Sequence, residues 1–195
     1  MILIGIDIGY VNMGVVRAIV DDSFNLHFTH AFRSDITFIR HNRIPVHMCT
    51  IPHTRETCDR VAHFIQENED IFEEADCILI ERQPPMGLKD VEALIMSRFR
   101  NKAILISPNK LHKFLKINTY DYEERKVHTE QIASKYLNNM ETFANEVRKH
   151  DMADAACMCI FYADKLRDEQ RKKEKLERIK RLPFDEYAFV HPGKI

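Results

Sequence analysis

The sequence contains no apolar run that approaches the ~18 residues required of a membrane-spanning helix, so we expect no membrane-embedded segment. A secretory signal is not expected either, because no basic residues precede the first apolar run and Asp7 interrupts it. The five cysteines form an odd set without regular spacings, which favours free thiols in a reducing intracellular compartment. With 195 residues, no internal repeat and no Gly/Ser-rich linker, the chain should form one globular domain with at most an appendage.

Acidic residues are missing from one long stretch of an otherwise balanced sequence. Lysine and arginine number 29 against 30 aspartates and glutamates, yet no acidic residue lies between Glu92 and Asp121. The basic residues in that window are Arg98, Arg100, Lys102, Lys110, Lys113 and Lys116. Residues 165–181 hold nine basic and four acidic side chains, a local excess of +5. Contacts with phosphates require such stripes, although a solvated helix surface explains the second stretch equally well.

The pattern of apolar residues predicts an α/β fold. Short β-branched runs bounded by turn residues predict strands at 2–8, 14–20, 26–32, 75–81 and 103–106, the last ended by Ser107-Pro108. Helical spacing predicts one helix from an N-cap at Thr54 to Phe72, and others at 88–99, 123–137 and 149–181. This order implies a mixed five-stranded sheet, with three antiparallel strands first and helices on both faces. We expect a domain at 1–165 and a charged helical extension at 166–195.

Acidic side chains occur at the edges or in the middle of three apolar runs. Asp7 lies between isoleucines in Ile-Gly-Ile-Asp-Ile-Gly, Glu81 closes Cys-Ile-Leu-Ile, and Asp151 and Asp154 precede Ala-Ala-Cys-Met-Cys-Ile-Phe. A lone buried carboxylate costs several kcal/mol, so it must be neutralised, paired or bound to a metal. Asp151 and Asp154 share one helix face at i and i+3, and capping of that helix is an alternative role for them.

Together the four carboxylates predict a site for hard divalent cations. Oxygen ligands with room for water suit Mg²⁺, for which Mn²⁺ can substitute, and we expect no organic cofactor. Two such ions ~3.5–4 Å apart can activate a water molecule and stabilise the leaving oxygen of a phosphodiester. Glu81 reaches Asp7 only if their two strands are neighbours in the sheet.

The acidic motifs resemble those of RuvC-like Holliday junction resolvases. Ile-Gly-Ile-Asp-Ile-Gly, Ile-Glu-Arg-Gln, Ile-Ser-Pro and His-Asp-Met-Ala-Asp-Ala are most similar to the resolvases of poxviruses, iridoviruses and related large DNA viruses. The resemblance covers about residues 1–165. It implies a ribonuclease H-like fold, a homodimer, and Mg²⁺-dependent paired nicking of four-way DNA junctions in viral replication and recombination. It also implies a location in the host-cell cytoplasm at viral replication sites, with packaging in virions as a further option.

The resemblance also assigns roles outside the carboxylates. Lys126, in Arg-Lys-Val-His-Thr, is similar in placement to the family's catalytic lysine, and Lys110 matches a position that contacts the scissile phosphate. A lysine near the metals can neutralise transition-state charge on the phosphate, although both residues could be ordinary surface lysines. Gln83 is carried by Ile-Glu-Arg-Gln, where orienting Glu81, contacting DNA and serving in a turn remain open. The residues expected to contact DNA are Lys110, Gln83, Arg98, Arg100, Lys113 and Lys116.

Three histidines and two cysteines fall within eighteen residues: His41, His47, Cys49, His53 and Cys58. Their spacing matches no paired zinc-ligand pattern, and Cys58 is expected on the apolar face of the first helix. The segment is therefore predicted to be a loop that contacts DNA through Arg40, Arg43 and Arg55, with a structural zinc site as the alternative.

Two other functional classes share parts of this pattern. A ribonuclease H-like nuclease that acts on RNA/DNA hybrids or other branched DNA would use the same carboxylates, because fold does not decide substrate. Ile-Asp-Ile-Gly also resembles the phosphate loop that opens actin-like ATPases and sugar kinases, but the second Asp-x-Gly loop of those proteins is missing. A junction-binding scaffold without activity is disfavoured, because all four acidic positions are present.

Overall fold

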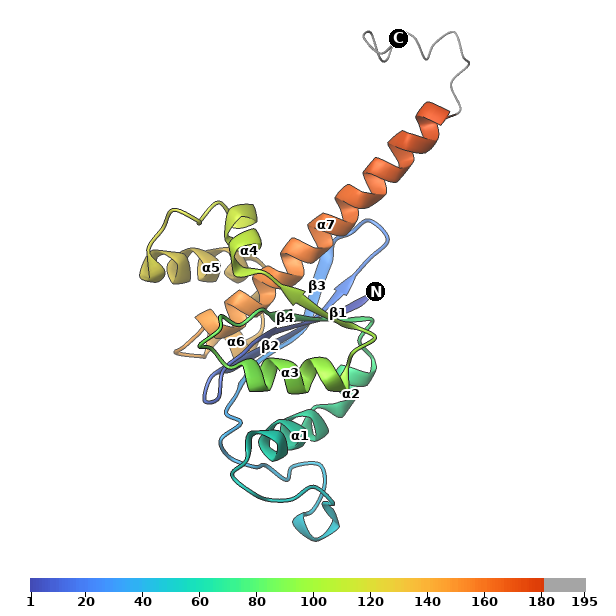
Figure 1. The fold of residues 1–195 in the computed structure, drawn as a ribbon. Coiled ribbons are helices and arrows are strands. Elements are labelled where there is room, and N and C mark those ends of the chain that lie inside the picture. Colours follow the sequence, from blue (N-terminus) through green and yellow to red (C-terminus); the bar gives the residue numbers. More distant parts are fainter. Residues whose placement is uncertain (181–195) are drawn as a thin grey trace.

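Five strands form one mixed sheet in the computed structural model, which describes residues 1–180 (Figure 1). They are β1 (Ile2–Asp7), β2 (Met13–Val20), β3 (Leu26–Ser34), β4 (Cys77–Glu81) and β5 (Ala103–Ile106). Their order across the sheet is β3-β2-β1-β4-β5, with β1 to β3 antiparallel to one another and β4 and β5 parallel to β1. The predicted mixed sheet with three antiparallel strands first is confirmed.

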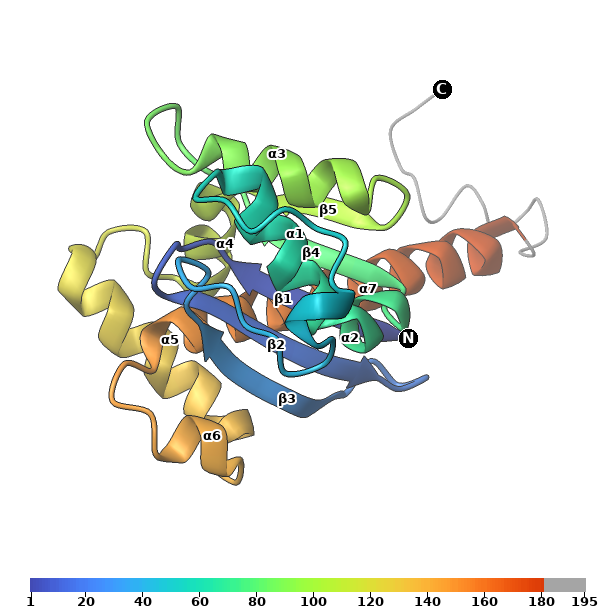
Figure 2. The ribbon, with the colours of Figure 1, turned by 90° about the horizontal axis from the view of Figure 1, so that it is seen from below.

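Helices cover both faces of this sheet (Figure 2). They are α1 (Thr57–Glu67), α2 (Glu69–Glu73), α3 (Lys89–Arg98), α4 (Pro108–Leu115), α5 (Tyr122–Leu137), α6 (Glu141–Ala144) and α7 (His150–Lys180), with one 3-10 turn, η1, at Val46–Met48. The first three helices pack on one face of the sheet, and α4 to α7 pack on the other. Within residues 1–180, no helix combines the length and the apolar character of a membrane span.

The alternation of side chains along the central strands determines which residues face α7. Ile6 packs in the layer of α1 and α3, whereas Leu3 belongs to the core beneath α7 and Gly5 lies against the α7 backbone. Residues i and i+2 share one face of a strand, so Asp7 points toward α7. The same alternation along β4 directs Glu81 to that side.

Two strand glycines allow α7 to approach the sheet closely. A Cβ atom on Gly5 would collide with the carbonyl oxygen of Ala155, and one on Gly14 would collide with the backbone of Asp151. Gly14 is also the residue of β2 that pairs with Asp7 in β1. Contact between backbones at Gly14 therefore brings the start of α7 to the end of β1.

The first helix begins later than predicted and is interrupted. Thr54 is not the N-cap, because α1 starts at Thr57 and the Thr54 hydroxyl instead accepts a hydrogen bond from the Glu56 N–H (3.1 Å) in a turn ahead of the helix. Asn68, at φ −119°, separates α1 from α2 and donates its side-chain amide to the carbonyl of Phe64 (2.8 Å). The expectation that Cys58 lies on the apolar face is also wrong, since Cys58 is exposed.

Helices α4 and α6 lie outside the predicted elements. Pro108, expected only to end the preceding strand, occupies the first turn of α4, where its missing N–H costs no helical hydrogen bond. Lys110 and Lys113 therefore lie on a helix, and Lys116 forms its C-cap in a left-handed conformation at φ 60°.

Helix α7 is continuous across the predicted boundary between residues 165 and 166. Its first turns are buried on the sheet, its last buried residue is Ala163, and its distal part projects from the body of the molecule (Figure 1). Residues 181–195, which would complete the predicted extension, lie outside the described residues.

Replacing Gly14 with alanine tests the close approach of α7. The added methyl group must displace the Asp151 backbone, so we expect the free energy of unfolding to fall by about 1–3 kcal/mol, the usual cost of overpacking. Gly5→Ala should destabilise the fold in the same way. Urea unfolding measures both variants. Without this close packing, alanine would be neutral or stabilising in a strand, so equal or higher stability would refute the arrangement described here.

Candidate active site

The carboxyl ends of β1 and β4 bring Asp7 and Glu81 together. The parallel register pairs Ile6 with Ile80, so the next residue on each strand is one of the two acids. Their carboxyl groups are within hydrogen-bonding reach of each other, and this contact raises the pKa of Asp7 while it opposes the rise in the pKa of Glu81. The strands are therefore neighbours, as joint use of the two acids requires.

Asp154 completes a carboxylate cavity from the side of α7. The cavity measures about 30 Å³, enough for one or two water-sized species. It is lined by Asp7, Glu81 and Asp154 together with Leu111, His112, Thr129 and Met158. The side chain of Thr129 on α5 lies within hydrogen-bonding reach of the Asp154 carboxyl group, while its hydroxyl donates to the carbonyl of Lys126 at 3.1 Å.

Burial and mutual repulsion make the carboxyl groups of this cavity hard to ionise. Burial, followed by the charges of Glu81, Asp154 and Asp151, raises the pKa of Asp7 well above its usual 3.8. The pKa of Asp154 rises from 3.8 to about 7, again mainly through burial, although the hydrogen bond with Thr129 opposes the rise. Burial also raises the pKa of Glu81. The structure thus places three acidic groups where solvation cannot stabilise their ionised forms.

Asp151 lies beside the cavity and is engaged by basic neighbours. Arg148 donates to both of its oxygens, from Nε to Oδ2 at 2.7 Å and from Nη2 to Oδ1 at 3.3 Å. His150 Nε2 lies 3.5 Å from Oδ1. Asp151 is 5% exposed, whereas the Arg148 side chain is 42% exposed. Arg148 can therefore move into solvent without disturbing the core.

The donor set fits a hard divalent cation. Asp7, Glu81 and Asp154 offer oxygen atoms to one small cavity, and Asp151 adds to the negative field there. A buried carboxylate cluster of this kind is costly unless protons or cations compensate it. Oxygen ligands favour Mg²⁺ or Mn²⁺ over softer metals.

Gln83 supports the site from within the fold. Its Nε2 donates to Glu81 Oε2 at 3.1 Å, and its backbone N–H donates to Glu92 Oε2 at 2.6 Å. Gln83 is only 8% exposed. The sequence left open whether Gln83 orients Glu81, contacts DNA or serves in a turn, and its hydrogen bond to Glu81 favours the first role. The expected contact with DNA does not fit a side chain that is buried and already hydrogen-bonded.

Lys126 lies at the rim of the site. Its Nζ is 3.9 Å from the ring centroid of Tyr122 and 3.5 Å from Glu123 Oε1. Thr129, one turn further along α5, reaches Asp154, and the charge of Lys126 contributes to lowering the pKa of His150. The ammonium group is thus near the carboxylates but outside the cavity that they line.

Several residues of the site were not among the predicted ones, including the polar residues Arg148, His112 and Thr129. Arg148 pairs with Asp151, while His112 and Thr129 line the cavity. Burial lowers the pKa of His112, which favours a neutral imidazole. The i, i+3 spacing of Arg148 and Asp151 in the sequence could have indicated that the two side chains pair. His112 could not be placed in the same way, because it lies on α4, a helix that was not predicted.

The basic residues expected to contact DNA fall into two groups. Lys110, Lys113 and Lys116 are exposed on α4 and its C-cap, and the same helix supplies Leu111 and His112 to the cavity wall. Arg98 is the last residue of α3 and Arg100 lies just beyond it, beside the start of β5 and at the opposite end of the parallel strands from Glu81. Arg98 is paired there with Glu73 at 3.4 Å.

Comparisons with solved structures decide the fold. The Fowlpox virus resolvase in complex with substrate Holliday junction DNA superimposes with a TM-score of 0.63 at 15% identity, covering 85% of this chain and 99% of that one. The chain has the fold of a RuvC-like Holliday junction resolvase. The yeast mitochondrial Holliday junction resolvase gives 0.58 at 16% identity over 87% of this chain and 85% of that one, and Thermus thermophilus RuvC gives 0.54 at 14% identity over 84% and 96%.

The predicted ribonuclease H-like, RuvC-type fold is therefore confirmed. No protein-family model matches the sequence, and no curated protein matches it at a significant level. At identities of 14–16%, the likeness establishes the architecture, and the chemistry has to be argued from the residues of this chain.

Because the pKa of Asp154 is raised, its contribution to the free energy of unfolding should decrease as pH rises when no metal is bound, the opposite of the effect of a salt-bridged carboxylate. Between the free value of 3.8 and the folded value of about 7, the folded chain keeps a proton that the unfolded chain has lost. The free energy of unfolding therefore falls as pH rises through this range, and the cost is complete above it. Asp154→Asn removes that cost.

Urea unfolding with EDTA measures the effect. From about pH 5 to about pH 8, the stability of Asp154→Asn relative to wild type should rise by on the order of 2 kcal/mol, at about 1.4 kcal/mol per pKa unit. Asp22→Asn, at an exposed position in the turn between β2 and β3, is the matched control and should show no such trend. A constant difference between Asp154→Asn and wild type would show that Asp154 ionises normally.

Proposed function

We propose that this protein is a Mg²⁺-dependent endonuclease that resolves four-way DNA junctions by paired nicking. The observation that carries the proposal is the convergence of Asp7, Glu81 and Asp154 on one buried cavity, with Asp151 beside it. The similarity of the fold to Holliday junction resolvases, one of them in complex with its junction substrate, supports the choice of substrate.

The four carboxylates are the proposed metal ligands. Asp7, Glu81 and Asp154 would hold Mg²⁺, or Mn²⁺ in its place, with two ions per site, and Asp151 would be a further ligand once it is free of Arg148. The chemistry that a bound divalent cation supplies is Lewis-acid activation of the phosphate and of a water molecule. Gln83 keeps Glu81 oriented toward the cavity.

Lys126 is the proposed electrostatic partner of the scissile phosphate. Among residues 1–180, its ammonium group contacts the ring of Tyr122 and the exposed side chain of Glu123. Exchange of these contacts for a phosphate oxygen would place a positive charge where negative charge develops in the transition state. Lys126 therefore acts from the rim of the site.

The proposed DNA surface adjoins the carboxylate cavity. Helix α4, which forms one wall of that cavity, carries the exposed side chains of Lys110 and Lys113 and ends at Lys116. A DNA backbone that crosses α4 could therefore bring one of its phosphates to the site. Arg98 and Arg100 are left out of this surface, because they lie at the other end of the sheet. Phosphate contacts of this kind position DNA without reading its sequence.

The biological setting is part of the proposal. A homodimer would place two active sites on a junction that is itself two-fold symmetric, so that opposed strands are nicked in pairs. The Fowlpox virus resolvase is a viral protein of this fold, which supports a role in viral genome replication and recombination. Five free cysteines support work in a reducing intracellular compartment, such as the cytoplasm of a host cell.

The direct test of the proposed function is cleavage by the purified full-length chain. A synthetic four-way junction, a linear duplex of the same sequence and an RNA/DNA hybrid are compared in Mg²⁺ and in EDTA. We expect paired nicks in the junction alone, and only with Mg²⁺. Preferential cleavage of the hybrid would identify a ribonuclease H-like nuclease instead, and failure to cut any substrate in Mg²⁺ would refute an endonuclease.

Removal of a metal ligand should separate cutting from binding. Asp7→Asn or Asp154→Asn is expected to lower nicking in Mg²⁺ by more than the ~100-fold that loss of an outer-shell partner can cost. Junction affinity in EDTA should be largely retained, because the basic surface on α4 is intact. Asp22→Asn is the control, with unchanged nicking. Normal cutting by either ligand variant would remove that residue from the catalytic site.

Neutralisation of the α4 lysines should weaken binding, because fewer DNA phosphates are then paired with a positive charge. In a triple Gln variant of Lys110, Lys113 and Lys116, the slope of log affinity against log salt concentration should flatten by about 0.9 for each phosphate that is no longer neutralised. The control is a double Gln variant of Arg98 and Arg100, whose slope should match that of wild type. An unchanged slope in the triple variant, or an equally flattened slope in the control, would overturn the assigned surface.

A further inference from the structure

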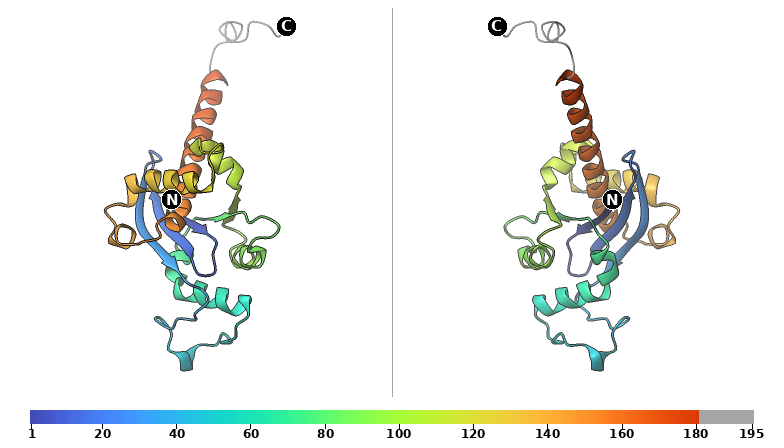
Figure 3. Two further views of the ribbon diagram at one scale, coloured as in Figure 1. Left: turned by 90° about the vertical axis from the view of Figure 1, so that its left-hand side faces the viewer. Right: turned by 90° about the vertical axis from the view of Figure 1, so that its right-hand side faces the viewer.

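The connection between β3 and α1 is long and has almost no apolar anchor. Residues 37–56 contain one short turn, η1, and none of these twenty side chains is buried. Phe38, Val46 and Met48 are 71%, 56% and 64% exposed. Figure 3 shows this segment at the end of the molecule opposite the projecting part of α7. Hydrophobic burial therefore does not hold the connection in place, and loops of this length are uncommon in compact domains.

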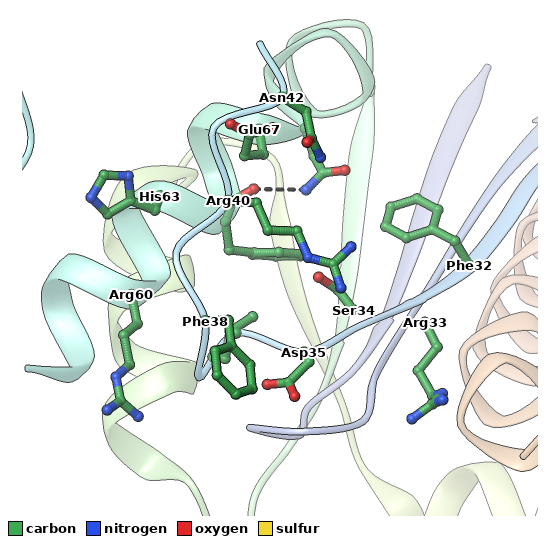
Figure 4. A pocket seen from close by; sticks show the side chains of 13 residues that line it. Phe32, Arg33, Ser34, Asp35, Phe38, Arg40, Asn42, Arg60, His63 and Glu67 are labelled. Atoms are coloured by element: carbon green, nitrogen blue, oxygen red, sulfur yellow. Dashed lines mark hydrogen bonds between the residues drawn. The ribbon is translucent and has the colours of Figure 1, made fainter. Parts of the chain in front are cut away.

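Polar groups form the boundary between this connection and α1. A cavity of about 120 Å³ lies at this boundary. It is lined by the end of β3, by Phe38, Arg40 and Asn42 of the connection, and by Arg60, His63 and Glu67 of α1 (Figure 4). The described salt bridge from the connection to the body joins Arg43 to Asp70, at the exposed surface. An exposed ion pair contributes little to stability, so this salt bridge alone holds the connection to the body of the protein only weakly.

Three metal-ligating side chains of the connection meet at one point. The nearest donor atoms of His41, Cys49 and His53 all lie within 4.8 Å of one another. The rings of His41 and His53 have their centroids 4.7 Å apart. His63, ten residues further along and on α1, joins this group, with its ring centroid 5.0 Å from that of His53 and 5.5 Å from that of His41.

His63 is oriented as a metal ligand requires. Its Nε2 lies 3.4 Å from the carbonyl oxygen of Pro52, so Nε2–H donates there and the lone pair remains on Nδ1. Nδ1 faces Cys49 Sγ at 3.8 Å. A backbone carbonyl that fixes the tautomer through the other ring nitrogen is the usual outer-shell partner of a ligating histidine. His63 is 2% exposed, which makes the arrangement part of the fold.

We propose that His41, Cys49, His53 and His63 bind a structural zinc ion. One thiolate and three imidazoles form a four-coordinate donor set that suits Zn²⁺. Bond lengths of about 2.0–2.3 Å around a tetrahedral ion separate the donors by about 3.3–3.8 Å, which is the observed separation of Cys49 Sγ and His63 Nδ1. Small side-chain rotations bring the remaining donors inward from 4.8 Å. Binding releases the thiol proton of Cys49 to solvent.

The zinc site is chemically and spatially separate from the carboxylate cavity. Its nitrogen and sulfur donors disfavour Mg²⁺, just as the carboxylate oxygens favour it. It lies beside α1, in the layer on the face of the sheet away from α7. Of the five candidates in this part of the sequence, His41, Cys49 and His53 are brought together, while His47 and Cys58 are not in the group found among the described residues.

The ion would fasten the connection to α1. Three ligands come from residues 37–56, which have no buried side chain, and the fourth comes from a buried position on the helix. A metal clip of this kind supplies the stability that a small apolar contact cannot. It also fixes the backbone that carries Arg40, Arg43 and Arg55.

Metal content and cobalt spectroscopy test the proposal without any activity measurement. The full-length chain, purified without chelator, should contain one zinc per molecule by mass spectrometry of the metal. Cobalt added to the zinc-free chain should give the visible absorption of a tetrahedral site and a thiolate-to-cobalt charge-transfer band. Cys49→Ser should abolish that band, and His53→Asn, at an exposed position, should weaken zinc binding beyond the ~10–100-fold cost of losing an outer-shell partner.

Matched variants make the result decisive. Cys58→Ser and His47→Asn change the same residue types at exposed positions outside the cluster and should keep full zinc content. Asp7→Asn should keep it as well, which separates this site from the proposed nuclease centre. No bound zinc in wild type, a cobalt spectrum without a thiolate band, or equal reductions of zinc content in Cys49→Ser and Cys58→Ser would each overturn the proposal.

Discussion

The close packing of α7 on the sheet is the contact on which the rest of the structure depends. At Gly5 and Gly14 the backbone of the helix touches the backbone of the strands, with no room for a Cβ atom between them. Met152, Ala153, Ala155 and Ala156 are fully buried in the resulting core. This contact brings Asp151 and Asp154 to the ends of β1 and β4, so the apolar packing stabilises a cluster of acids that would separate if it were free to do so.

The fold tolerates that cluster because protons and Arg148 compensate part of its charge. Burial and mutual repulsion raise the pKa of Asp7 and burial raises that of Glu81, so both groups hold protons more readily than free carboxyl groups, and Arg148 pairs with Asp151 from a position open to solvent. A bound divalent cation could replace both the protons and the Arg148 guanidinium. Metal binding at this site would therefore change the free energy of unfolding. A second donor set of imidazoles and a thiol lies on the other helical layer, where it can fasten a segment that has no core of its own. Because carboxylate oxygens favour Mg²⁺ or Mn²⁺ whereas imidazole and thiolate donors favour Zn²⁺, the two proposed sites would select different metals.

Sequence reasoning recovered the strands because their apolar runs are short and bounded, and it found Asp7 and Glu81 because charge is conspicuous in such runs. It could not establish that β1 and β4 are neighbours, since strand order is a property of the whole chain. Pro108 was interpreted as a stop although proline also begins helices, so α4 and His112 were missed. The stretch without acidic residues suggested one basic surface, but Arg98, at the end of α3, and Arg100, just after it, lie at the other end of the parallel strands from the lysines of α4. His63 was not grouped with the other histidines, because its contact with them is tertiary.

Packing of α7 against β1 and β4 builds the proposed site for a divalent cation. Crystals of the protein grown with Mn²⁺ test it most directly, through the anomalous scattering of the bound metal. We expect anomalous density from Mn²⁺ in the cavity bounded by Asp7, Glu81 and Asp154. This density should be absent from crystals of Asp154→Asn. Crystals that contain Mn²⁺ but show no anomalous density between these carboxylates would contradict the proposed site.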